Sequence, residues 1–409
     1  MHDDNRASPR EDAPEGAPPP PSAGAAWAPD PAGGRDAGPD PGGSHAAIGG
    51  PLEPAVEVAL PRFDAAQWAH TTRGLTAWFL ILVTFGLGGL LLGQEELAIL
   101  AAIAGLFVAA QAADVDRQWR MLHYMLTWVV PAAGLALFVA LTYMVTSTRL
   151  SGPWSPALAA LCLGGALASV LTLVRPLSHA LASRMFHTAS TSHTQRLAAR
   201  MVLLCLMFAL PGWFAVRNLF DTLANPIGSL VETSSLGTGL IGYVLLALAS
   251  VGYMLRRDLR ESLARLGIGR IGARHALAIA AGVLMLYALN TGADALQQRY
   301  FRDLWVQDQR MSEAIGGNLG VAGTIVLGLS AGIGEEITMR GALQPQLGLL
   351  GTSLVFASLH VQYSWYGMCV IFLLGILLGT LRRLTNTSVA MAVHALYDMA
   401  AVFSVGHPR

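Results

Sequence analysis

The stretch GTIVLGLSAGI, Gly323 to Ile333, is a largely apolar run that leads directly into GEEITMR, Gly334 to Arg340. Two adjacent glutamates and an arginine therefore stand at the end of a segment that is apolar enough to enter a lipid bilayer. Each charged side chain at the centre of a membrane helix costs about 3 kcal/mol on insertion scales. We therefore expect these three charges to have partners, water or a chemical role.

The rest of the chain has the composition of a membrane protein. Of its 409 residues, 53% are hydrophobic and 13% are charged, which is about half the ~25% charged share of soluble domains. Apolar stretches near the ~20 residues that cross a bilayer recur from Leu75 to the C-terminus. We count about eleven segments: 75–93, 97–113, 122–146, 155–174, 198–216, 236–255, 274–292, 319–341, 343–361, 366–381 and 387–405. Since lipid cannot solvate free backbone groups and runs of this length exclude strands, the sequence predicts an all-α, polytopic transmembrane helical bundle.

Three regions are expected along the chain. Residues 1–60 are rich in Pro, Gly, Ala and Asp, which predicts a disordered tail. The tail lacks a signal-peptide pattern, so the first helix is expected to direct insertion. A polar loop at 256–274 separates an N-terminal transmembrane bundle of unknown role, 72–265, from a C-terminal bundle, 274–405.

The basic residues predict the orientation and exclude one class of partner. All of them are arginine, and those near segment ends gather in alternate loops, which predicts a cytoplasmic N-terminus for a multi-pass integral protein of the plasma (inner) membrane. The formal net charge is zero, so no electrostatic case exists for a nucleic-acid partner. The expected partners are membrane lipid and a peptide or protein substrate.

On a helix, the spacing of the charged residues gives them different roles. Glu336 and Arg340 are four residues apart with the acid first, which favours an ion pair on one face. Glu335 points about 100° away from that pair. Its apolar setting and its like-charged neighbour favour a carboxylate that accepts protons near neutral pH. The interpretation is that Glu336 and Arg340 are a scaffold and that Glu335 is a base.

Two later segments carry further groups of this kind. FASLH ends in His360, and the final segment carries His394 and Asp398 four residues apart on one face. Taken alone, each histidine has an ordinary structural explanation. Ionisable groups on three of four consecutive membrane segments, however, can converge in the bundle interior.

Such a cluster can hydrolyse an amide in two ways. A glutamate and a histidine can activate water while a second histidine stabilises the oxyanion. The same side chains could hold zinc, for which Glu335, His360 and His394 are the candidate ligands. No HExxH motif is present, so the spacing leaves the metal unknown.

These residues resemble the CAAX prenyl protease and bacteriocin-processing (CPBP, or Abi) family of intramembrane endopeptidases. The family motifs EExxxR, FxxxH and HxxxN or HxxxD stand in order over about residues 280–405. They correspond to Glu335, Glu336 and Arg340, to Phe356 and His360, and to His394 and Asp398. GALQPQLG also looks like the family's RGxLQ segment. The resemblance does not cover the N-terminal half.

The resemblance implies an activity and a set of catalytic residues. Glu335 with His360 would activate the water, His394 with Asp398 would form the oxyanion site, and Glu336 with Arg340 would support the helix. Family members are described both as metalloproteases and as metal-independent glutamic proteases. Many have asparagine in place of Asp398, and an ionised aspartate cannot donate to an oxyanion.

The leading prediction is a CAAX protease-like enzyme that hydrolyses a peptide bond at or in the membrane. The alternatives are a catalytically silent membrane scaffold or immunity protein and an ion- or proton-coupled transporter. Three other groups of polar residues have ordinary structural explanations: Glu95 and Glu96 in a solvated turn, His187 and His193 in a polar loop, and Asn290 and Asp294 near a helix end.

Overall fold

The computed structural model describes residues 64–147, 155–222, 233–317 and 319–406, and these residues belong to one compact unit. All their named secondary-structure elements are helices, without a named strand, so the all-α class is confirmed. The predicted tail, 1–60, lies outside the described residues. The α-helices are α1 Ala65–Leu91, α2 Glu95–Val115, α3 Arg120–Leu126, α4 Val129–Ser147, α5 Ser155–Leu171, α6 Arg175–Met185, α7 His193–Thr222, α8 Thr233–Val251, α9 Leu259–Arg265, α10 Ala273–Tyr300, α11 Arg302–Gly316, α12 Val321–Ser330, α13 Gln344–Ser358, α14 Trp365–Leu384 and α15 Thr387–Gly406. A 3₁₀ turn, η1 Arg117–Trp119, precedes α3, and two π-helical segments, η2 Ala331–Glu335 and η3 Ile337–Leu343, join α12 to α13.

The count of about eleven membrane segments is not confirmed. Among the described residues, eight helical stretches are long and apolar enough to cross a bilayer, and a ninth is possible if α5 and α6, bent by 107°, form one span. The segments expected at 319–341 and 343–361 are one continuous stretch, Val321–Ser358, because the chain stays helical through η3. Its only non-helical residue is Gly348, whose φ of 78° produces a kink.

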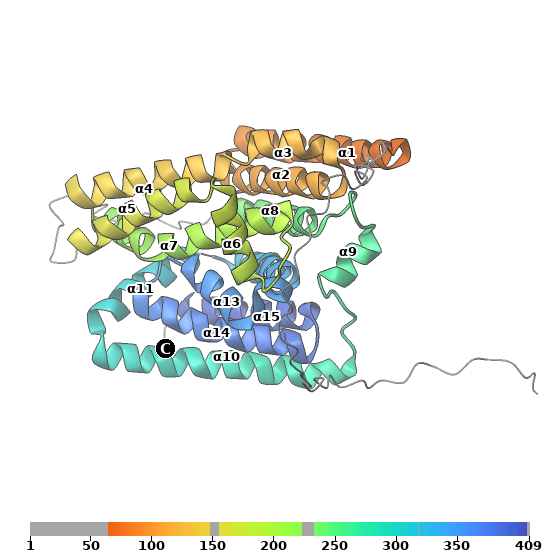
Figure 1. The fold of residues 1–409 in the computed structure, drawn as a ribbon. Helices are drawn as coiled ribbons and strands as arrows, with labels where there is room; N and C mark the ends of the chain where they lie inside the picture. The colour runs from red at the N-terminus through yellow and green to blue at the C-terminus, as the bar shows by residue number, and fades with distance from the viewer. Residues whose placement is uncertain (1–63, 148–154, 223–232, 318, 407–409) are drawn as a thin grey trace, which may run out of the picture. The chain divides into compact units, whose positions relative to one another are not determined.

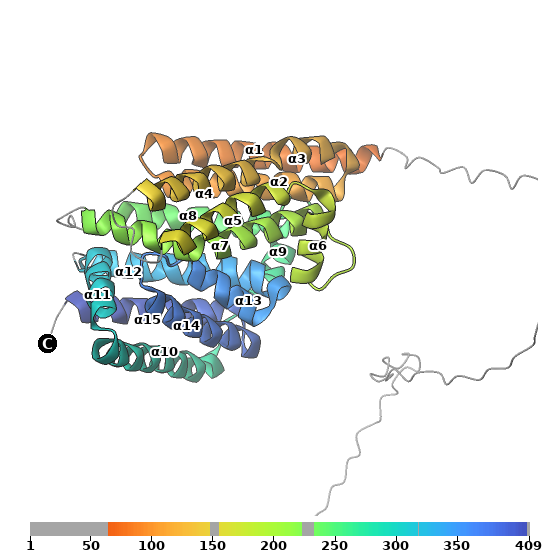
Figure 2. The same ribbon diagram turned by 60° about the vertical axis from the view of Figure 1, so that its left-hand side comes forward.

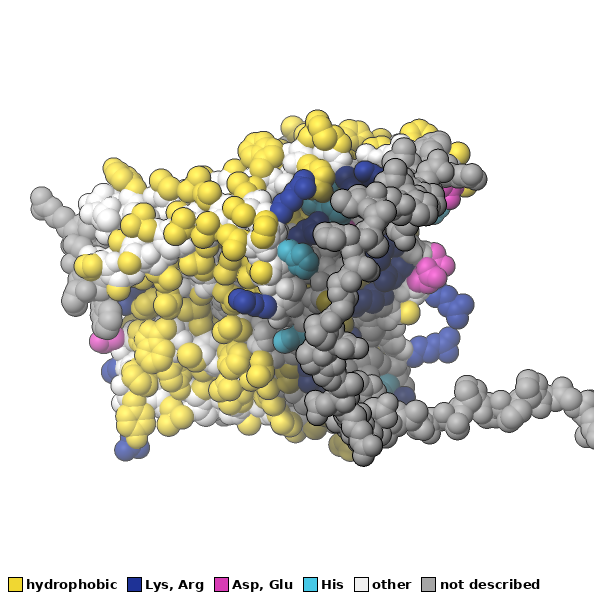
Figure 3. Space-filling model, in the orientation of Figure 1, with side chains coloured by type: hydrophobic (Ala, Val, Ile, Leu, Met, Phe, Trp, Pro, Cys, Tyr) yellow, Lys and Arg dark blue, Asp and Glu magenta, His cyan; other side chains and the backbone are white. Residues whose placement is uncertain are grey.

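The protein is an integral membrane protein, and its outward faces agree with a lipid surrounding. Leu277 and Leu284 on α10 are 79% and 69% exposed. Hydrophobic side chains cover much of the face shown in Figure 3, and a band of arginines and histidines lies toward its right side. A large apolar outer surface is costly in water and favourable in hydrocarbon.

The described helices are stacked in layers, as Figures 1 and 2 show. Helix α1 packs on α2, and α2 packs on α8. Helix α8 in turn contacts α12 and both π-helical segments, which pack on α15. Helix α10 forms the opposite side against α14 and α15. Helix α8 thus joins the regions expected to form two bundles, and their division into separate bundles stays a prediction.

Polar anchors fix the first layers. Trp78 is 1% exposed, and its indole N–H donates to the Tyr253 carbonyl at 2.8 Å. Gln111 on α2 donates from Nε2 to the Ser250 carbonyl at 2.6 Å. Both bonds reach the carboxyl end of α8, where carbonyls lack helical partners. They therefore set the register of α1 and α2 against α8.

Two glycines allow α12 to lie close against α15. A Cβ on Gly328 would lie 2.7 Å from the Ala395 carbonyl oxygen, and one on Gly332 would lie 2.6 Å from the Ala395 backbone nitrogen. Small residues four apart let the backbones of membrane helices approach closely. This contact brings η2 and the residue that follows it, Glu336, beside His394.

Candidate active site

The centre of the site is a fully buried carboxylate. Glu336 is 0% exposed, and its Oε1 lies 3.0 Å from Arg340 Nη1 and 2.9 Å from His394 Nδ1. The guanidinium also donates from Nη2 to the Gly375 carbonyl at 3.3 Å. A buried charge is tolerated where it is paired and hydrogen-bonded. One oxygen of Glu336 thus joins the first motif to the third.

The backbone around this carboxylate differs from the expected α-helix. Glu336 lies at the junction of η2 and η3, so the residues on both sides have π-helical geometry. A π-helix has a wider turn, and it changes the relative directions of Glu335 and Arg340. Short π-helical pieces in helices are frequent at functional sites.

Phe356 packs against charged or polar groups of all three motifs. Its ring centroid lies 4.4 Å from the Arg340 Cζ, 4.7 Å from the His360 ring and 6.1 Å from the His394 ring. A guanidinium over an aromatic face is attracted by the ring quadrupole. Phe356 is 4% exposed, so it fills the space between these groups and excludes water there.

His360 lies just beyond the end of α13, in the turn that leads to α14. Its Nδ1 is 2.8 Å from the Phe356 carbonyl oxygen, which can only accept. Nδ1 therefore carries the hydrogen in the neutral ring, and Nε2 is left as an acceptor. Burial lowers the pKa of His360 below its ordinary value, which favours this neutral form.

His394 lies between two carboxylates. Its Nδ1 points to Glu336, while its Nε2 is 3.5 Å from Asp398 Oδ2, one turn further along α15. The pair that the spacing of four predicted is therefore present but long for a direct hydrogen bond. His394 is 6% exposed, and the Asp398 side chain is 19% exposed.

These groups border a polar cavity of about 840 Å³. Glu335, His360, His394 and Asp398 all line it, and Glu335 is half-buried. Glu335 has no hydrogen-bond or ion-pair partner among those found for the described residues, in contrast to the buried Glu336. The structure therefore brings all four predicted residues to one cavity, with the scaffold pair Glu336 and Arg340 behind its wall.

Helices α2 and α8 also line this cavity. Glu96 and Tyr243 contribute to its wall, and the Glu96 carboxylate lies against α8, since a Cβ on Gly239 would come 3.0 Å from its Oε2. Tyr243 can lie there because Gly334 lacks a side chain: a Cβ on Gly334 would come within 2.9 Å of the ring. The sequence predicts Glu96 in a solvated turn; Glu96 is exposed, but it stands in the first turn of α2 and also lines the cavity. In that first turn an acidic side chain is stabilised by the helix dipole without any distant partner.

His193 and Asp294, which the sequence explains as loop and helix-end residues, have structural partners. His193 begins α7, and its Nδ1 lies 2.9 Å from Asp114 Oδ1 on α2, so it is not in a solvated loop. Asp294 lines the polar cavity and accepts from Trp305 Nε1 at 2.8 Å and from Gln309 Nε2 at 3.1 Å. Asp114 thus connects α2 to α7, and Asp294 connects α10 to α11.

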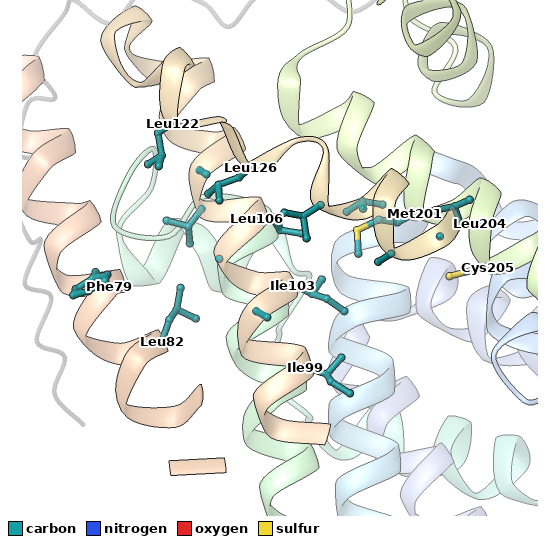
Figure 4. A pocket seen from close by; sticks show the side chains of 18 of the residues that line it. Phe79, Leu82, Ile99, Ile103, Leu106, Leu122, Leu126, Met201, Leu204 and Cys205 are labelled. Atoms are coloured by element: carbon teal, nitrogen blue, oxygen red, sulfur yellow. The ribbon is translucent and has the colours of Figure 1, made fainter. Parts of the chain in front are cut away.

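A second cavity has the opposite character. It measures about 1040 Å³ and is lined by α1, α2, α3, α4 and α7 together with Trp119 of η1. Figure 4 shows aliphatic and aromatic side chains such as Phe79, Leu106 and Leu204 around it. Its lining has no acid, base or histidine that could act as a general acid or base in hydrolysis.

The residues do not fit a protein-held metal in the arrangement seen. Among the described residues, no three His, Cys, Asp or Glu side chains are grouped so that they could hold an ion. His394 in particular has its Nδ1 committed to Glu336.

Comparison with known proteins covers the same segment. Residues 317–400 match the family described as Type II CAAX prenyl endopeptidase Rce1-like, and they include every motif residue from Glu335 to Asp398. The protein YpbD of Bacillus subtilis (strain 168), described as uncharacterized, is 31% identical over 115 residues. That similarity covers 27% of this chain and 60% of YpbD, so the chain spans less than two thirds of the relative. No solved structure matches the chain.

Proposed function

We propose that Glu335 and His360 activate water for peptide-bond hydrolysis in the membrane, and the match of residues 317–400 to the Rce1-like family of type II CAAX prenyl endopeptidases supports this. The observation that carries the proposal is the polar cavity. Its wall contains a carboxylate without a partner among the described residues and an imidazole whose Nε2 is left as an acceptor.

The two bases would divide the work as follows. Glu335 accepts a proton from a water molecule that His360 orients through Nε2, and the water oxygen adds to the substrate carbonyl carbon. When the tetrahedral intermediate collapses, the carbon–nitrogen bond breaks and the proton passes from Glu335 to the leaving amine. The products are a new carboxyl group and a new amine, so atoms and protons balance.

His394 would stabilise the oxyanion. Its Nδ1–H is directed to Glu336, which leaves Nε2 as the nitrogen nearest the cavity group Asp398. A hydrogen on Nε2 can be donated to the developing oxyanion, and Asp398 stabilises a ring that carries hydrogens on both nitrogens. In this assignment Asp398 orients His394, which an ionised aspartate can do. Asp398 then does not have to donate a hydrogen bond to the oxyanion.

Glu336 and Arg340 would position the other groups. The Glu336 carboxylate fixes the tautomer and orientation of His394, and Arg340 neutralises that carboxylate inside the bundle. Phe356 keeps this charged layer apart from water. No step of this proposal passes through a metal ion.

The substrate would be a peptide segment presented at the membrane. The family description names CAAX prenyl endopeptidases, so a prenylated C-terminal peptide is the first substrate to test. We further propose that the protein is in the plasma (inner) membrane, and the arginine distribution predicts that its N-terminus is cytoplasmic.

Purified protein in lipid vesicles tests the function. Glu335→Ala and His360→Ala should each lower cleavage of a peptide library by about 10²- to 10⁴-fold, the usual contribution of acid–base catalysis. Glu95→Ala is the matched control, because Glu95 is exposed on α2 and does not line the cavity. Retained cleavage in both variants would contradict the proposal.

The same preparation separates the alternatives. A biological effect that survives both substitutions would favour a silent scaffold or immunity protein. Ion flux that needs Glu335 and His360 while no peptide is cut would favour a transporter. Loss of cleavage on addition of a chelator, with recovery on addition of zinc, would show metal-dependent chemistry.

A further inference from the structure

One buried carboxylate outside the matched family segment reaches the turn that carries His360. Asp308 on α11 is 8% exposed. Its Oδ1 accepts from the Ser364 backbone N–H at 2.6 Å, and its Oδ2 accepts from the Ser364 hydroxyl at 2.6 Å. Oδ2 also accepts from Gln297 Nε2 on α10 at 2.6 Å. Three short bonds to one carboxylate make a rigid junction between three segments of the chain.

Ser364 is well placed to transmit this constraint. It is 0% exposed and is the N-cap of α14, where its hydroxyl also accepts from the Gly367 backbone N–H at 3.2 Å. Its neighbour Tyr363 donates its backbone N–H to the His360 carbonyl at 3.1 Å. The turn 359–364 is therefore held by Asp308 at one end and by the end of α13 at the other.

The local geometry shows that the junction is closely fitted. A Cβ on Gly367 would lie 3.0 Å from Asp308 Oδ2, so the first turn of α14 approaches the carboxylate as closely as a glycine permits. Burial of an aspartate in this position is tolerated because its oxygens are satisfied. Local demands of α11 do not explain it, since the bonds all go to α10 and to the start of α14.

We propose that Asp308 is a positioning residue for His360, and that α10 and α11 thereby belong to the catalytic apparatus although the family match begins at residue 317. The inference rests on the proposed function for its kinetic part. Its structural part, the rigidity of the turn 359–364, is independent of that function.

The test uses the full chain in vesicles and measures two properties. Asp308→Asn keeps the size of the side chain, but its amide NH₂ cannot accept from the donors that the lost oxygen served. We expect faster amide hydrogen exchange in 359–364 and a kcat about 10- to 100-fold lower with KM nearly unchanged, because a small displacement of a catalytic group has effects of this size.

Two control variants change other contacts of α11 and leave the junction at Ser364 intact. Trp305→Phe removes one of the two bonds from α11 to Asp294, leaving that from Gln309, and does not touch Ser364. Asp303→Asn changes an exposed carboxylate in the first turn of α11. Both should keep the kcat and the slow exchange of 359–364.

A second pair of variants tests the route through Ser364. Ser364→Ala removes the hydroxyl and keeps the backbone N–H, so it should have a smaller effect than Asp308→Asn. The double variant should be no worse than Asp308→Asn alone, because the residues act through one junction. Asp308→Glu, which retains the acceptors, should recover part of the kcat.

Each outcome decides one part of the proposal. Faster exchange without loss of kcat, or a loss of kcat without faster exchange, would overturn the positioning role. Unchanged exchange and kcat in Asp308→Asn would overturn the junction itself. If the wild type cleaves no peptide, the proposed function fails and the positioning role falls with it, while hydrogen exchange still tests the junction.

Discussion

The two cavities are similar in volume and opposite in chemistry. The cavity among α1, α2, α4 and α7 measures about 1040 Å³ and is almost wholly apolar, whereas the one bordered by α8, α11, η2 and α15 measures about 840 Å³ and contains the ionisable motif residues. The larger cavity is therefore not the better candidate for catalysis. In a membrane protein, charged groups are expensive to bury, so the place where they gather marks the site more reliably than the volume of a cavity does.

The first way to sharpen this comparison is to remove one partner of the buried ion pair. Glu336→Gln leaves the Arg340 charge buried without its carboxylate, and loss of one partner of a buried pair costs about 3 to 5 kcal/mol. We expect a large fall in the midpoint of thermal unfolding in detergent. Glu336→Gln combined with Arg340→Gln should be milder than Glu336→Gln alone, and an unchanged midpoint in the single variant would contradict the pairing.

A second test concerns the helix contact that assembles the polar cavity. A Cβ at position 332 would lie 2.6 Å from the Ala395 backbone, so Gly332→Ala should push η2 away from α15 and destabilise the protein by about 1 to 3 kcal/mol. Cleavage should fall as well, since η2 carries Glu335. The matched control is Gly292→Ala, because a Cβ there has no neighbour within 4 Å. Equal midpoints for the two variants would argue against the close contact.

The apolar cavity should tolerate filling. Ala102 lines it and is exposed on α2, so Ala102→Phe adds a ring to a space that contains no ionisable group. We expect a cleavage rate within about twofold of the wild type, as surface substitutions usually have small effects. A loss of tenfold or more with unchanged unfolding would show that the N-terminal cavity takes part in the reaction.

The parts of this structure that the sequence predicts are those set by local spacing. The all-α class follows from apolar runs of bilayer length, and the i, i+4 spacing brings Glu336 to Arg340 and His394 toward Asp398. The family resemblance is likewise carried by short motifs and is confirmed for residues 317–400. The catalytic roles given to these residues stay predictions.

The rest depends on contacts between distant segments, which spacing does not reveal. The shared oxygen of Glu336 needs the close approach of η2 and α15 at Gly332, and the π-helical turns depend on packing around them. Glu96 and Asp308 look like ordinary helix-surface acids in the sequence. Only the packing of α2 and α11 places Glu96 in the cavity wall and gives Asp308 its partners.

A double-mutant cycle on kcat tests the central claim most directly, that Glu335 and His360 act on the same water. Glu335→Gln, His360→Asn and the double variant should be compared in vesicles on one peptide. If both residues serve one water, the double variant should lose no more than the worse single variant, because residues that act as a unit are strongly non-additive. Losses that multiply in the double variant would contradict the account.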